Sequence, residues 1–492
     1  MLTSYNKYRK KFHIFSSVFL KLITMAENKG LHVVVFPWSA FGHLIPHFQL
    51  SIALAKAGVH VSFISTPKNL QRLPPIPPSL SSFITPVPIP LPKLPGDPLP
   101  EGAEATVDIP FEKIPFLKVA LDLAEPPFRK FIADHPHPPD WFIVDFNVSW
   151  ISDISREFRV PIVFFRVLSP GFLAFYAHVL GARLPLSEIG SLISPPPIEG
   201  STVAYRRHEA VGIRAGFFEK NDSGMSDYER VTKIISACQA IAVRTCYEFD
   251  VDYLKLYSNY CGKKVIPLGL LPPEKPPKTE FEANSPWKST FEWLDQQNPK
   301  SVVFVGFGSE CKLTKDQIHE IARGVELSEL PFLWALRKPD WAEDSDVLPA
   351  GFPDRTAGRG MVSMGWAPQM EILGHPAIGG SFFHGGWGSA IEALEFGNCL
   401  ILLPFIVDQP LNARLLVEKG VAVEVERNED DGCFSGEAIA KALREAMVSG
   451  EGEKIRKRAE EVAAIFGDTK LHQRYIEEFV EFLKNRDPIP NQ

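Results

Sequence analysis

The chain has 492 residues, of which 45% are hydrophobic and 23% are charged. This is ordinary globular composition, and the length exceeds what one hydrophobic core normally supports, so we expect two domains. The formal net charge of -7, with acids and bases interspersed, leaves no broad basic surface and argues against a nucleic-acid partner. The six cysteines include no C-x-x-C pair and no zinc spacing, which predicts no disulfide framework, no structural metal and a cytoplasmic location.

The first 30 residues stand apart from the rest. A basic run ends at Lys11, and the apolar stretch at 12–23 faintly resembles a signal sequence. Lys21 interrupts that stretch, no small-residue cleavage site follows, and a second methionine, Met25, precedes the first clean strand. Residues 1–30 are therefore predicted to be a disordered extension or the product of a misplaced start. No stretch elsewhere has the length and apolarity of a membrane-spanning helix.

Residues 31–268 alternate between strand and helix signals and are predicted to form the first domain. It starts with a βαβ unit, in which an apolar run suits a buried parallel strand and the following helix stops at Gly58. The expected strands are residues 31–36, 59–65, 141–146 and 161–167, and the helix of the unit is 47–58. Between residues 66 and 127 prolines are dense, which predicts long surface loops without regular structure.

A proline-rich, charged segment at 269–286 is the expected linker to a second domain at 287–470. This domain restarts with a buried strand that ends in a glycine turn, and Thr314 and Gln317 form a capping box at the next helix. Its expected strands are 301–309, 331–336, 377–383, 399–403 and 421–425. Both halves are therefore predicted to be open α/β sheets, whose ligands lie beyond the carboxyl ends of the strands, in a cleft between the domains.

The segment HGGWGS at 384–389 lies between a predicted strand and a helix that we expect to begin near Ser389. Glycines leave backbone N–H groups unshielded, and the helix directs its positive end to the same point, so an anion is expected there, with His384 as a further donor. A purely structural interpretation stays open, because Ser389 and Glu392 can form an S-x-x-E capping box and glycines permit tight packing.

Two other enzyme classes fit this segment less well. An esterase of the α/β-hydrolase type would use a glycine-rich oxyanion loop, but the chain has no G-x-S-x-G nucleophile elbow. A nicotinamide dehydrogenase needs G-x-G-x-x-G after the first strand, where this chain has PWSAFGH. Both classes lack their key residues here.

Residues 366–409, WAPQMEILGHPAIGGSFFHGGWGSAIEALEFGNCLILLPFIVDQ, closely resemble the signature box of the plant UDP-sugar-dependent glycosyltransferases. The motifs GH after the first strand, FVGFGS at the start of the second half and DQPLNARLL after the box extend the resemblance over nearly the whole chain. PLPEGAE, WFIVDF and ELSELPFLWALR are most similar to the branch that adds a sugar to a sugar already on a glycoside, which includes soyasaponin rhamnosyltransferase-like enzymes.

This resemblance implies two Rossmann-like doubly wound domains facing across a cleft, the GT-B fold, with residues 471–492 as a C-terminal helix returning towards the first domain. It implies a UDP-sugar as co-substrate, no cofactor, a small hydrophobic glycoside as acceptor, and a monomer. Trp366 would stack on the uracil, Ala367 and Gln369 would hold the base and ribose, and Glu392 would bind the ribose hydroxyls. The expected diphosphate-binding residues are Ser309, His384, Gly388 and Ser389, and the expected sugar-binding residues are Asp408 and Gln409. Trp387 is a further expected UDP-sugar-binding residue.

The chain departs from the family's usual HCGWNS at two positions. Gly385 replaces the cysteine, and Gly388 replaces an asparagine that contacts phosphate or sugar in many members. The sugar-on-sugar branch often replaces that asparagine, so the change supports the branch assignment. It also leaves Gly388 with only its backbone N–H as a donor.

His43, just after the first strand, is the expected catalytic base. A helix N-terminus disfavours the protonated imidazole, and removing the proton of an attacking alcohol is worth on the order of 10²–10⁴-fold in rate. His47 is the alternative, although its position past Pro46 points to the helix. Asp145 follows four apolar residues and matches the aspartate that orients this histidine in the family.

No metal is expected at the site. Asp250 and Asp252, and Asp344 and Asp346, have the D-x-D spacing of metal-dependent glycosyltransferases, but neither pair follows a strand, so we interpret both as solvated turns. The helix start at 385–389 would neutralise the departing UDP, and single displacement predicts inversion. Glucose and rhamnose both stay open as the sugar, and direct glycosylation of an aglycone or a non-catalytic nucleotide-sugar binder are the alternatives.

Overall fold

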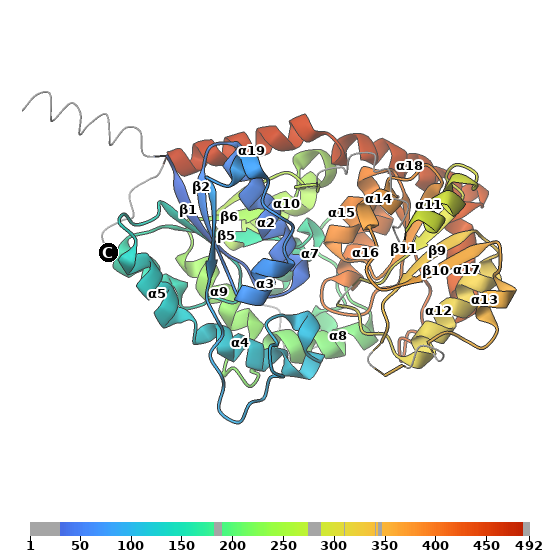
Figure 1. Cartoon of the computed structure of the whole chain (residues 1–492), viewed down its shortest axis with the longest axis horizontal. Helices are drawn as coiled ribbons and strands as arrows, with labels where there is room; N and C mark the ends of the chain where they lie inside the picture. Colours follow the sequence, from blue (N-terminus) through green and yellow to red (C-terminus); the bar gives the residue numbers. More distant parts are fainter. Residues whose placement is uncertain are drawn as a thin grey trace, which may run out of the picture.

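Two parallel β-sheets, each covered by helices, form the two halves of the molecule (Figure 1). The computed structural model describes residues 30–181, 189–273, 287–308, 310–339, 341–342 and 347–485. Residues 1–29, most of the expected linker, Ser309, Asp344 and Asp346 lie outside this range. The prediction of two doubly wound α/β domains is confirmed. None of the helices in the described ranges combines the length and apolar character needed to cross a bilayer.

The first sheet is built from short runs of buried residues, as expected when helices cover both faces of a parallel sheet. Its strands are β1 (His32–Phe36), β2 (His60–Ser65), β3 (Ile84–Pro88), β4 (Trp141–Val144), β5 (Ile162–Arg166), β6 (Ala240–Val243) and β7 (Lys264–Pro267). They lie in the order β3-β2-β1-β4-β5-β6-β7. One face packs on α2 (Phe41–Lys56), and the other packs on α5 (Glu125–Asp134), α6 (Ile151–Phe158), α7 (Pro170–Gly181), α9 (Asp227–Ala237) and α10 (Tyr247–Cys261).

The second sheet has the order β10-β9-β8-β11-β12-β13. Its strands are β8 (Val302–Val305), β9 (Phe332–Leu336), β10 (Gly360–Met364), β11 (Ile378–Phe383), β12 (Cys399–Leu402) and β13 (Ala422–Glu424). Its helices are α11 (Lys288–Asp295), α12 (Lys315–Ser328), α13 (Phe352–Arg355), α14 (Gln369–Leu373), α15 (Trp387–Glu395), α16 (Gln409–Glu418), α17 (Gly436–Met447) and α18 (Gly450–Phe466). The capping box at Thr314 is confirmed, since its side chain accepts a hydrogen bond from the N–H of Gln317 at the start of α12.

The prediction that prolines exclude regular structure between residues 66 and 127 is wrong. Strand β3 carries Pro86 and Pro88, which the sheet tolerates because β3 is an edge strand and one side of its backbone needs no partner. Helices α3 (Pro67–Arg72) and α4 (Ile114–Asp122) both start with proline in the first turn, where its missing N–H costs nothing.

Both sheets reverse their strand order at one point. In the first sheet β1 lies between β2 and β4, and in the second β8 lies between β9 and β11. The chain leaves these neighbouring strands in opposite directions, so a crevice opens beyond their carboxyl ends. The segments after β1, β4, β8 and β11 therefore share the cleft between the two halves.

The C-terminal helix α19 (Thr469–Lys484) leaves the second half and packs along the first sheet, on the same face as α2 (Figure 1). Phe479 and Leu483 are buried in this contact, and the indole N–H of Trp141 donates to the carbonyl oxygen of Leu483 (2.9 Å). The hydroxyl of Tyr475 donates to Glu248 (2.8 Å). The last helix thus ties the two halves together.

Replacing Phe479 by alanine should lower the free energy of unfolding by about 3–5 kcal/mol, because it leaves a cavity between α19 and the sheet. Thermal and urea unfolding would measure this loss. Glu478→Ala, on the exposed side of the same helix, is the matched control and should change stability by less than about 0.5 kcal/mol. Equal effects of the two substitutions would mean that α19 is not anchored through this face.

Candidate active site

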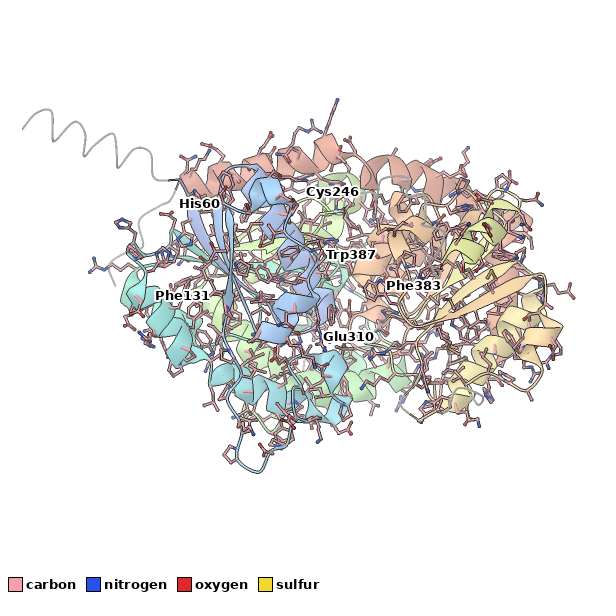
Figure 2. All side chains as sticks on the ribbon, in the orientation of Figure 1. His60, Phe131, Cys246, Glu310, Phe383 and Trp387 are labelled. Atoms are coloured by element: carbon pink, nitrogen blue, oxygen red, sulfur yellow. The ribbon has the colours of Figure 1, made fainter. Side chains whose placement is uncertain are left out.

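A cleft of about 2660 Å³ separates the two halves and is lined by residues of both. Figure 2 shows Glu310 and Trp387 of the second half where the halves meet. Glu310 accepts hydrogen bonds from the first half, from the hydroxyl of Thr106 (2.9 Å) and the N–H of Phe41 (3.4 Å). The cleft is thus closed on one side by direct contacts between the halves.

His43 and Asp145 meet at the switch point of the first sheet. His43 lies in the first turn of α2, directly after β1, and Asp145 directly follows β4, which pairs with β1. Nδ1 of His43 lies 2.6 Å from Oδ2 of Asp145. The His43 side chain is 20% exposed and lines the cleft, whereas that of Asp145 is 3% exposed. The expected pair is therefore in contact.

Asp145 is held as a carboxylate. It accepts backbone N–H bonds from Trp38 (3.2 Å) and Phe146 (2.8 Å). Burial alone would raise the pKa of this group, but the charge and hydrogen bond of His43, with His47 and the N–H of Phe146, bring the pKa of Asp145 well below its usual range. Because an ionised carboxylate only accepts, Nδ1 of His43 carries the proton and Nε2 is the basic nitrogen.

His47 is not placed to act on a ligand. Helix α2 begins at Phe41 rather than at 47, with Pro46 in its second turn, so the expected helix start was wrong. The ring of His47 is fully buried against Phe165, its Nδ1 donates to the carbonyl oxygen of His43 (2.8 Å), and burial lowers its pKa to about 4. A proline this early removes only one backbone hydrogen bond, so the helix continues through it.

The segment 384–389, where we expect an anion to bind, leads into the start of α15. That helix begins at Trp387 with Gly386 as its N-cap, so Ser389 is its third residue and the alternative of a Ser389–Glu392 capping box is wrong. Gly385 has φ +85°, a conformation that favours glycine. The unpaired N–H groups of the first turn thus point to the cleft, which Gly388 and Ser389 line.

His384 and Trp387, two of the expected UDP-sugar-binding residues, differ in the groups that they leave for a ligand. Nδ1 of His384 is buried without a hydrogen-bond partner within the described ranges, and burial lowers the pKa of this ring to about 4. The Trp387 side chain is buried, and its indole N–H donates to the carbonyl oxygen of Arg244 in the first half (3.2 Å), so only its backbone remains for a ligand.

Trp366 stands out as the most exposed large apolar side chain of the described residues, at 89% exposure. It lies in the loop between β10 and α14, beside Ala367. An indole with both faces open is suited to stacking on a flat ring. Gln369 donates through Nε2 to Glu392 (2.6 Å), and both line the cleft. Burial raises the pKa of Glu392, against the hydrogen bond of Gln369 and the charge of Arg244.

Asp408 and Gln409 lie at the start of α16 and line the same cleft. Burial raises the pKa of Asp408, while a hydrogen bond from Asn412 (2.8 Å) opposes this. The side-chain oxygen of Gln409 accepts the N–H groups of Phe405 (2.9 Å) and Ile406 (3.1 Å), which leaves its Nε2 for a ligand. Gln409 therefore also shapes its own loop.

The loop before Asp408 is strained and is held from the first half. Val407 has φ +54°, which is rare for a β-branched residue and costs on the order of 1–3 kcal/mol. The hydroxyl of Tyr205, in the first half, donates to the carbonyl oxygen of Val407 (2.8 Å). Nothing in the sequence pattern pointed to Tyr205.

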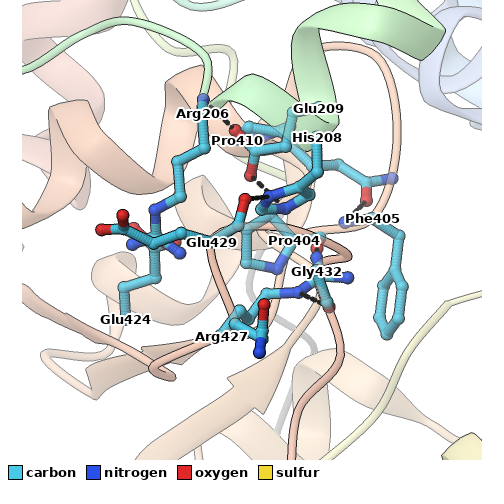
Figure 3. Close-up of polar contacts among 12 residues, drawn as sticks. Arg206, His208, Glu209, Pro404, Phe405, Pro410, Glu424, Arg427, Glu429 and Gly432 are labelled. Carbon is cyan, nitrogen blue, oxygen red and sulfur yellow. Dashed lines mark hydrogen bonds and ion pairs between the residues drawn. The ribbon is translucent and has the colours of Figure 1, made fainter.

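A buried charged cluster joins the halves beside this loop (Figure 3). Arg414 of α16 donates from Nη2 to both carboxylate oxygens of Glu209 (2.9 and 3.0 Å), which lies on α8 (Arg207–Ile213) of the first half. Arg206 contacts Glu424 (3.2 Å) from the same side. Because the pair of Arg414 and Glu209 is buried and its members come from different halves, it holds α16 against α8.

Of the two D-x-D pairs, only Asp250 and Asp252 lie within the described residues, and one of them differs from the prediction. Asp252 is exposed, but Asp250 is fully buried in α10 and pairs with Lys419 of the second half (3.3 Å), so its interpretation as a solvated turn is wrong. Asp250 has non-helical backbone angles that break the helix, which turns its side chain inward. No group of three or more potential metal ligands occurs among the described residues.

Burial raises the pKa of Asp250 to about 6, against the charge of Lys419. The folded protein therefore keeps this proton to a higher pH than the unfolded chain, and ionised Asp250 subtracts from stability as pH rises through 6. Between pH 5 and pH 7.5 the free energy of unfolding of the wild type should therefore fall by about 1 kcal/mol more than that of Asp250→Asn. Melting temperatures at both pH values test this, with exposed Asp252→Asn as a control that should follow the wild type.

Comparison with known proteins identifies the family of the chain. The family model described as UDP-glucoronosyl and UDP-glucosyl transferase matches residues 278–456. UDP-glycosyltransferase 91A1 of Arabidopsis thaliana is 41% identical over 471 residues, covering 93% of this chain and 97% of the relative. Soyasaponin III rhamnosyltransferase of Glycine max is 38% identical over 464 residues, covering 93% and 96%.

The same fold occurs in a solved structure. Phytolacca americana UGT2, complexed with UDP-2fluoro-glucose and pterostilbene, matches with a TM-score of 0.74 at 22% identity, over 93% of this chain and 100% of that one. The chain therefore belongs to the plant UDP-glycosyltransferases, in the branch that includes the soyasaponin rhamnosyltransferase, and is an enzyme that transfers sugar from a UDP-sugar to small molecules.

Proposed function

We propose that this enzyme transfers glucose or rhamnose from its UDP-sugar to a hydroxyl on the existing sugar of a small glycoside, with inversion and without a metal. The observation that carries the proposal is the contact between His43 and Asp145 at the cleft. In the neutral imidazole whose Nδ1–H donates to Asp145, Nε2 is the nitrogen that can accept a proton, and His43 lines the cleft that an acceptor would enter.

The reaction follows from the positions of the two halves. The acceptor oxygen gives its proton to Nε2 of His43 and forms a bond to the anomeric carbon, while the bond from that carbon to UDP breaks. Asp145 stabilises the resulting imidazolium. The N–H groups at the start of α15 face the departing diphosphate and supply the charge stabilisation that a metal gives elsewhere. Attack from the face opposite to UDP inverts the anomeric configuration.

The acceptor would lie against the first half. Aromatic and aliphatic side chains of the first half line the cleft there, including Phe111, Ile114, Phe172 and Tyr176. The ion pair of Lys118 and Asp227 also borders this wall. An apolar wall with a few polar groups suits a multi-ring glycoside. The name of the Glycine max relative supports a saponin as the acceptor and rhamnose as the sugar.

His43→Ala should lower the turnover number by about 10²–10⁴-fold and leave UDP binding unchanged, because only the acceptor's proton loses its base. Asp145→Asn should also lose activity, since an amide can present its N–H to Nδ1 and favour the wrong tautomer. Steady-state kinetics and titration calorimetry with UDP measure the two effects. His60→Ala, exposed at the opposite end of the sheet, is the control. Near-normal turnover in His43→Ala would remove the base assignment.

Incubation with UDP-glucose or UDP-rhamnose, each with saponin, steviol and flavonoid glycosides and with their aglycones, tests the substrates. We expect a product with a sugar-to-sugar linkage of inverted configuration, unchanged in the presence of EDTA, by mass spectrometry and NMR. Products from aglycones alone would establish the direct alternative. Loss of turnover with EDTA would overturn the metal-free mechanism.

A further inference from the structure

Arg244 is a buried cation of the first half that reaches the donor side of the cleft. It directly follows β6 and is 2% exposed. Its Nε donates to the carbonyl oxygen of Leu270 (2.7 Å), and its Nη2 donates to those of Leu271 (3.0 Å) and of the Gln49 side chain (3.1 Å). Two of the three guanidinium nitrogens are therefore occupied, and they fix the orientation of the third.

The third nitrogen, Nη1, has no hydrogen-bond or ion-pair partner within the described part of the chain. It lies 3.6 Å from the position that a β-carbon would take at Gly388, the second residue of α15. Both residues line the cleft. A largely buried arginine thus presents its unpaired nitrogen to the cleft, beside the start of a helix.

Among the residues that the structure describes, no carboxylate pairs directly with Arg244. Burial lowers its pKa to about 10, while the charge of Glu392 opposes this, so the group stays cationic at neutral pH. None of its hydrogen-bond acceptors carries a charge. A buried cation without a hydrogen-bonded anion is costly, and an anion bound next to Nη1 would relieve that cost.

We propose that Arg244 is a donor-binding residue whose Nη1 hydrogen-bonds the diphosphate of the UDP-sugar, in the space left open by the missing side chain of Gly388. The inference rests on the UDP-sugar donor of the proposed function. It means that the diphosphate is held from both halves, by the start of α15 on one side and by a guanidinium on the other. As the bond from the sugar to UDP breaks, the charge that builds on UDP meets a cation already in place.

The test compares UDP, UMP and uridine by titration calorimetry. In Arg244→Met, UDP should bind about 10- to 100-fold more weakly, the range expected for a lost hydrogen bond to a charged group, whereas uridine should bind as in the wild type. UMP tells which phosphate is contacted: weaker UMP binding indicates the α-phosphate, and unchanged UMP binding the β-phosphate. Equal losses for uridine and UDP, or no loss for UDP, would overturn the proposal.

Two further variants separate recognition from folding. Arg230→Met removes a fully buried arginine that pairs with Asp122 (2.5 Å) away from the cleft, and it should leave the ratio of UDP to uridine affinity unchanged. If Arg244→Met does not fold, Arg244→Lys is used, because its single ammonium cannot hold the carbonyls of Leu270 and Leu271 and also reach Gly388. UDP should then bind at least about fivefold more weakly with uridine unchanged, and a uniform loss would again overturn the proposal. Failure of the wild type to bind UDP would instead reject the proposed function.

Discussion

The contact between His43 and Asp145 depends on one constraint of parallel sheets, that neighbouring strands end at the same edge. Strands β1 and β4 pair in register, so the residues after them share one crevice although they are 102 positions apart. The second sheet repeats the arrangement with β8 and β11, and places the start of α15 there. Strand order therefore places the residues that we propose for catalysis in one half and those that we propose for donor binding in the other, on the two sides of the cleft.

The site also requires that the two halves keep a fixed position relative to each other. Helix α19 packs on the first sheet, Glu310 is bonded to Thr106, and the pair of Glu209 and Arg414 is buried between α8 and α16. These contacts lie around the cleft rather than across it, so they set its width without filling it. Arg244 adds a residue of the first half at the donor side, and a sugar nucleotide would lie between groups from both sheets.

Much of the fold and several site residues could be predicted from the sequence, because a buried strand and the polar residues after it form a recognisable local pattern. Asp145 directly follows a buried apolar strand, where a polar residue is unusual enough to notice, and His43 lies in the turn and helix start that follow another such strand. Arg244 has the same signal, but β6 has four residues, two of them alanine, and does not contrast with its flanks. Strands β7 and β10 were missed as well, and β3 was hidden by its prolines. The partners of Asp250 and Val407 come from the other half of the chain, which no local pattern reveals.

The strained backbone at Val407 links the shape of the loop before Asp408 to the distance between the halves. This conformation is unfavourable by itself and is held by Tyr205, which belongs to the other half. Any separation of the halves that breaks this hydrogen bond lets the loop relax and moves Asp408 with it. The geometry of this loop is therefore coupled to the spacing of the two halves, because the contact that holds its least favourable residue crosses from one half to the other.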